Sequence, residues 1–140
     1  MKIVICGSMS AVKEMQDVKE HLTSKGFSVT IPQIPKYRDL IGRNKVSPNE
    51  RTKDKIKFDL IRGYYKKIKG SDIVLVVNPE KNGIKGYIGG NTFVEMAFAH
   101  VLDKKLFCLY QIPKMAYTSE ILAFRPIILN GNLEKLGKIK

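Results

Sequence analysis

The stretch IVLVV at residues 73–77 is the most apolar run in the sequence. Its short length and its β-branched residues are typical of a strand that is buried on both faces of a sheet. A second such run, KIVIC at residues 2–6, ends at Gly7-Ser8 and predicts the first strand. Weaker apolar runs predict three further strands, at residues 27–31, 106–110 and 126–129.

Segments with helical spacing separate these strands. In the segment that ends at Gly26, apolar residues recur at helical intervals, at Val12, Met15, Val18 and Leu22. The proline-containing segment 32–46 has no sustained period and is expected to be a loop. Ser47, Pro48 and Glu50 form the signature of a helix start. This helix should run to about Lys69, with an apolar face of Ile56, Leu60, Ile61, Tyr64, Tyr65 and Ile68.

Two more helices are expected, from Thr92 to about Asp103 and from Ser119 to Phe124. Buried strands that alternate with helices are typical of a parallel sheet with helices on both faces. We therefore predict an α/β fold of the doubly wound, flavodoxin-like kind, with a parallel five-stranded sheet of order 2-1-3-4-5 in three α/β/α layers. The 140 residues suffice for one compact core, so a single domain is expected over residues 1–140.

The chain is strongly basic, with 25 Lys and Arg against 13 Asp and Glu and a formal net charge of +12. Twelve Lys or Arg and four Asp or Glu lie between residues 36 and 69. Such a run is either a solvated surface or a surface that attracts phosphates or nucleic acid. No apolar run approaches a membrane span, the chain opens on a strand rather than a charged leader, and Cys6 and Cys108 lie in apolar strands. These features predict a cytoplasmic protein with reduced thiols and no membrane association.

In sheets of this order, ligands bind beyond the carboxyl ends of the strands, where the winding reverses between the first and third strands. Two loops reach this crevice, one at residues 7–10 and one at residues 78–91. Both are rich in glycine and small polar residues, as backbone contacts to a phosphate or sugar require. The candidate ligand-binding residues in them are Gly7, Ser8, Met9, Asn78, Gly89, Gly90 and Asn91. Neither loop matches a P-loop or a dinucleotide fingerprint.

Glu95 is the best candidate for chemistry, because a carboxylate in the first turn of the helix after the central strand could be a nucleophile or a general base. The alternative is structural, since Thr92 and Glu95 have the spacing of a capping box. Asp59 is a candidate second carboxylate, whereas Asp72 is expected to be a turn residue. His21 and His100 are explained by surface exposure and the helix dipole. Histidine and cysteine spacing predicts no metal site.

Three stretches together resemble the nucleoside 2-deoxyribosyltransferase family, which includes the deoxynucleoside 5′-monophosphate N-glycosidases. They are residues 5–8, 71–78 and 89–97, in that order. The resemblance implies that Glu95 attacks the anomeric carbon and that the Gly7-Ser8 turn approaches the sugar and, in the monophosphate enzymes, the phosphate. It also implies the double displacement of retaining glycosidases, in which water makes the enzyme a hydrolase and a second base makes it a transferase.

Two positions depart from the family pattern. Gly89 stands where relatives carry Asp or Ser, and Tyr64 and Tyr65 lie nearest to the place of a family aspartate. Asp59, Tyr64 and Tyr65 are therefore the candidates for the acid that assists the departing base.

The resemblance further places Ser119 where the monophosphate enzymes use a phosphate-binding serine from the neighbouring subunit, which implies a homodimer or larger homo-oligomer. Ser119 could equally be a helix N-cap. The leading interpretation is an enzyme that acts on N-glycosidic bonds of nucleosides or nucleotides, without a cofactor. The alternative is a non-catalytic nucleotide-sensing or nucleic-acid-binding module, whose affinity for polyanions would depend steeply on salt.

Overall fold

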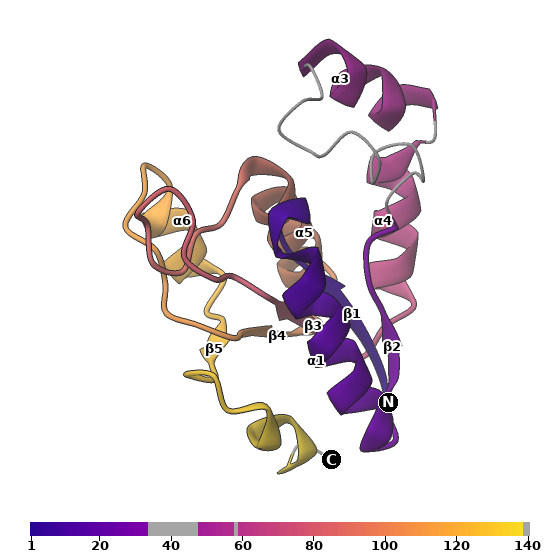
Figure 1. Ribbon diagram of the computed structural model, residues 1–140, viewed down its shortest axis with the longest axis vertical. Helices are drawn as coiled ribbons and strands as arrows, with labels where there is room; N and C mark the ends of the chain where they lie inside the picture. The colour runs from indigo at the N-terminus through magenta and orange to yellow at the C-terminus, as the bar shows by residue number, and fades with distance from the viewer. Residues whose placement is uncertain (34–47, 58, 139–140) are drawn as a thin grey trace.

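The computed structural model describes residues 1–33, 48–57 and 59–138 (Figure 1). Five parallel strands form one sheet in the order β2-β1-β3-β4-β5. The strands are β1 (Lys2–Cys6), β2 (Ser28–Thr30), β3 (Ile73–Val76), β4 (Lys105–Cys108) and β5 (Ile127–Ile128). The predicted strand order and parallel pairing are confirmed. All four residues of β3 are fully buried, as the central place of this strand requires.

Helices cover both faces of the sheet, so the predicted three-layer arrangement is also confirmed (Figure 1). On one face, Met15, Val18 and Leu22 of α1 (Val12–Ser24) pack against Ile3 and Ile5 of β1. On the other face, the alternate β1 residues pack against three helices. These are α4 (Leu60–Lys69), α5 (Gly90–Val101) and α6 (Thr118–Ala123).

The predicted helix 47–69 is wrong as a single helix. It is divided into α3 (Pro48–Lys57) and α4, because Asp59 before α4 adopts a left-handed backbone with φ 46°. The side chain of Ile56 is 75% exposed, so only part of the predicted apolar face is buried. Figure 1 shows α3 standing away from the sheet. The predicted loop at 34–46 and the predicted N-cap Ser47 lie outside the described residues.

The described residues also include two short 3-10 helices, η1 (Met9–Ala11) after β1 and η3 (Leu133–Lys138) after β5. The sequence analysis predicted neither. Leu136 of η3 is fully buried in the same core as α1. Among the described residues, no helix is long and apolar enough to cross a membrane.

Candidate active site

The Gly7-Ser8 turn directly follows β1 and lies beside the end of β3. A Cβ atom on Gly7 would lie 2.7 Å from the carbonyl oxygen of Val77 and 3.2 Å from the sulfur of Met15. Only glycine therefore fits between the two strand ends without displacing backbone. The turn leads into η1, which contains Met9, and the Ser8 and Ser10 hydroxyl oxygens lie 2.9 Å apart.

Asn78 holds together the two loops that follow β3 and β4. Its amide nitrogen donates to the carbonyl oxygens of Gly86, Tyr110 and Gln111 at 3.1–3.3 Å, and its amide oxygen accepts from the Tyr110 N–H at 2.9 Å. The side chain is 1% exposed. Asn78 therefore shapes the crevice by joining its two loops, and its contact with a ligand stays a prediction.

Residues 81–84 form a two-residue β-hairpin that the sequence analysis did not identify. The N–H and C=O groups of Lys81 and Ile84 bond reciprocally at 3.1 and 2.9 Å. Asn82 and Gly83 have positive φ values of 53° and 75°, as this kind of turn demands. The Asn-Gly dipeptide is the strongest short-range signal for such a hairpin and could have revealed it.

Lys81 is carried by this hairpin into the crevice, and it too was missed as a site residue. Its ammonium nitrogen donates to the Ser8 hydroxyl at 3.1 Å and lies 5.3 Å from the centre of the Tyr87 ring. A hollow of about 180 Å³ opens here. It is lined by Ser8, Ser10, Ala11, Val77, Pro79, Glu80, Lys81 and Tyr87.

A larger hollow of about 550 Å³ lies near the amino end of β1, between α1 and η3. Its lining includes His21, Lys25 and Glu134, and the His21 Nε2 atom is 3.1 Å from a Glu134 carboxylate oxygen. We assign ligand binding to the smaller hollow despite its size, because ligands of doubly wound sheets bind beyond the carboxyl ends of the strands.

Glu95 lies in the second turn of α5, not in the first turn as predicted. The helix has Gly89 as its N-cap, so Thr92 is already its third residue and is buried. Thr92 cannot be an N-cap there, and the capping-box alternative for Glu95 is wrong. Gly90 and Asn91 are the first two residues of α5, where helical N–H groups point outward from the helix end.

The charge of Glu95 affects two neighbouring groups, Cys6 and Tyr64. Burial, followed by the charge of Glu95, raises the pKa of the Cys6 thiol. The pKa of the Tyr64 hydroxyl is raised by burial, then by Cys6 and by Glu95. Tyr64 donates its hydroxyl to the carbonyl oxygen of Ile5. The Tyr64 hydroxyl therefore lies at the end of β1, and its role as an acid stays a prediction.

Asp59 and Ser119 occupy more exposed positions. Asp59 precedes α4 and pairs with Arg62 of the same helix at 3.3 Å. Ser119 is the second residue of α6, whose N-cap is Tyr117, so its alternative as the N-cap is wrong. Asp72 accepts from the Lys2 N–H at 2.8 Å and has the structural role that was predicted.

No three His, Cys, Asp or Glu side chains gather into a possible metal site among the described residues. Cys6 and Cys108 are both buried free thiols, as expected.

No protein family and no curated protein matches this sequence. Among solved structures, the chain is similar to the CMP N-glycosidase BcmB of Clostridium botulinum, with a TM-score of 0.54 and 18% sequence identity. The similarity covers 98% of each chain. At this identity it shows a shared fold over nearly the whole chain.

Proposed function

We propose that this protein cleaves or transfers the N-glycosidic bond of nucleosides or nucleoside 5′-monophosphates, with Glu95 as the nucleophile. The observation that carries the proposal is the place of Glu95, which is half-buried in the second turn of α5, the helix that follows β3 at the ligand-binding edge of the sheet. Functional sites commonly use a half-buried carboxylate at the ligand-binding end of such a sheet. A fold shared with a CMP N-glycosidase supports the reaction class.

In the proposed first step, a Glu95 carboxylate oxygen attacks the anomeric carbon as the bond to the base nitrogen breaks. The electron pair leaves with the base, which takes up a proton. In the second step, water or another base attacks the same carbon and releases the carboxylate. Water yields a free sugar or sugar phosphate and transfers its proton away, whereas a second base yields a new nucleoside or nucleotide.

Asp59 and Tyr64 stay predictions as the acid that protonates the departing base. The Tyr64 hydroxyl already donates a hydrogen bond to the carbonyl oxygen of Ile5, and its raised pKa makes it a weak acid. We therefore propose that Tyr64 positions Glu95. The proton that the departing base takes up would then come from Asp59 or from solvent.

The substrate pocket is proposed to lie between the two loops. The turn after β1 contains Gly7, Ser8 and Met9. The start of α5 contains the N-cap Gly89 and the first helical residues, Gly90 and Asn91. A helix N-terminus favours anionic groups. We also propose a homodimer in which the exposed Ser119 contributes to the neighbouring subunit's site.

The test is chromatography of free base released from ribonucleosides, deoxyribonucleosides and their 5′-monophosphates, with and without a second base. Wild type should release or exchange a base, and Glu95→Ala and Glu95→Gln should lose at least about 10³-fold in rate, as removal of a nucleophile does. Glu20→Ala, at an exposed position on α1, is the matched control and should retain full activity. Equal rates in the Glu95 variants would contradict the proposal.

A second candidate function rests on the exposed cations Lys66, Lys67 and Lys69 in the last turn of α4, together with the charge of +12. If no base is released from any substrate, binding of long polyanions that weakens steeply with salt would favour a nucleic-acid-binding module.

A further inference from the structure

The hairpin at residues 81–84 holds Lys81 in a defined position at the crevice. Its turn is closed by two backbone hydrogen bonds between Lys81 and Ile84. The loop beyond it is fixed at Gly86, where an added Cβ would lie 2.0 Å from the carbonyl oxygen of Gln111. Asn78 ties the same loop to the segment after β4. A lysine on such a support loses less side-chain freedom on binding a ligand than one on a mobile loop.

The hollow beside Lys81 is the right size for one polar group rather than for a whole substrate. Its volume is about 180 Å³, whereas pockets that enclose a complete drug-sized ligand measure roughly 300–1,000 Å³. Its lining includes the Ser8 and Ser10 hydroxyls together with the Lys81 ammonium, which donates to Ser8, and the Tyr87 ring. Two hydroxyls and an ammonium offer several hydrogen-bond donors to an anion with many oxygen acceptors.

Glu80 also lines this hollow, and its carboxylate opposes an anion. The Glu80 side chain is exposed, whereas Lys81 is half-buried. Solvent and salt therefore screen the charge of Glu80 more strongly than that of Lys81.

The hollow and Glu95 lie at the same edge of the sheet. Ser8, which lines the hollow, follows β1 by two residues, and Glu95 lies in the second turn of α5, the helix that follows β3. Ligands of doubly wound sheets bind at this edge, beyond the carboxyl ends of the strands. In a nucleoside 5′-monophosphate, one sugar ring separates the anomeric carbon from the phosphate.

We propose that Lys81, with the Ser8 and Ser10 hydroxyls, binds the 5′-phosphate monoester of the substrate and so selects nucleoside 5′-monophosphates over nucleosides. This inference rests on the proposed function for the position of the sugar at Glu95. It assigns substrate selection to a residue on the loop after β3, in addition to the turn after β1.

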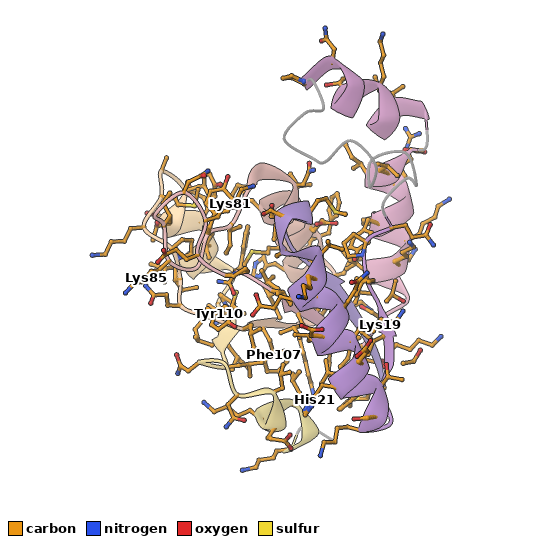
Figure 2. The ribbon with its side chains drawn as sticks, in the orientation of Figure 1. Lys19, His21, Lys81, Lys85, Phe107 and Tyr110 are labelled. Carbon is orange, nitrogen blue, oxygen red and sulfur yellow. The ribbon has the colours of Figure 1, made fainter. Side chains whose placement is uncertain are left out.

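The experiment compares each 5′-monophosphate with its own nucleoside, by kcat/KM for base release and by calorimetric binding to Glu95→Ala at fixed ionic strength. Lys81→Met should lower kcat/KM and affinity for the monophosphates about 10- to 100-fold, as expected for a lost charge-assisted hydrogen bond. The values for nucleosides should not change. Lys81→Arg should retain most of the preference. Lys85→Met, at an exposed lysine on the same loop (Figure 2), is the matched control and should behave as wild type.

The outcomes separate the two proposals. Turnover with no preference for monophosphates, or an unchanged preference in Lys81→Met, overturns the inference and leaves the proposed function standing. Monophosphate binding that depends on Lys81, without base release by wild type, overturns the proposed function and retains the phosphate site. Neither binding nor turnover overturns both.

Discussion

Gly7 has no room for a side chain beside the end of β3, and its substitution tests this close approach. In Gly7→Ala, the new Cβ would meet the backbone oxygen of Val77 at 2.7 Å, and backbone cannot move aside as a flexible side chain can. We expect the free energy of unfolding to fall by about 1–3 kcal/mol, measured by urea denaturation.

Gly63 provides the matched control, because it lies inside α4 with nothing within 4 Å of an added Cβ. Gly63→Ala should raise the free energy of unfolding by about 0.5–1 kcal/mol through helix propensity alone. A Gly7→Ala protein as stable as wild type would show that the strand ends can separate.

Sequence reasoning could place the candidate residues that follow a strand closely in the chain. Gly7 and Ser8 directly follow β1, and Glu95 lies on the helix after β3, so the topology alone brings them to one edge. Lys81 was missed because its place depends on a hairpin within a long loop. For Asn78 we predicted a contact with the ligand. Its hydrogen bonds reach Tyr110 and Gln111, more than 30 positions away, and no local sequence pattern reveals them.

At the scale of elements, η3 is the part of the fold that the sequence analysis left out, yet Leu136 within it is fully buried. Leu136→Ala should lower the free energy of unfolding by about 2–4 kcal/mol, because it removes a leucine side chain from the core under α1. Chemical denaturation measures the change. Lys138→Ala, at an exposed position of the same element, should have little effect. Equal stability of the two variants would mean that η3 does not contribute to the core.

Helix boundaries were the weakest sequence predictions, for physical reasons. A capping pattern at Thr92 is outweighed by tertiary packing, which starts α5 at Gly90 and buries Thr92. The left-handed Asp59 divides a segment whose apolar spacing continues through it. A six-residue 3-10 helix such as η3 has too few residues to establish a period.

The whole molecule is expected to be sensitive to alkali. Burial raises the pKa of Cys108 to about 12, and the hydrogen bond to Glu14 is the main cause that raises the pKa of Tyr110 to about 12. The pKa values of Cys6, Tyr64 and Tyr117 are also raised, chiefly by burial. In the unfolded chain, cysteine and tyrosine titrate near 8.5 and 10. Above these values the unfolded chain binds fewer protons than the folded protein, so the free energy of unfolding must fall as pH rises toward 12.

Denaturation in urea between pH 7 and pH 11.5 measures this loss. The stability should be constant up to about pH 8 and should then fall. Tyr110→Phe removes one of the titrating groups and should show a shallower decline above pH 10. A stability that stays constant to pH 11.5 would contradict the burial of these groups.

The sheet order was predictable because few topologies place five parallel strands with short, right-handed crossovers. Strands buried on both faces have an apolar signature that does not depend on exact boundaries, as residues 73–77 illustrate. The single domain over residues 1–140 stays a prediction. The charge of +12 favours an anionic ligand but does not locate it, since that requires the hairpin that carries Lys81.

The central claim is that Glu95 forms a covalent bond with the sugar. We would incubate the protein with a 2-deoxy-2-fluoro analogue of whichever substrate releases its base, and measure the mass of the intact protein and of its peptides. We predict an added mass equal to the sugar or sugar phosphate, located on the peptide that contains Glu95, and no added mass in Glu95→Gln. Base release from the analogue without any adduct, or an adduct that persists in Glu95→Gln, would contradict the claim.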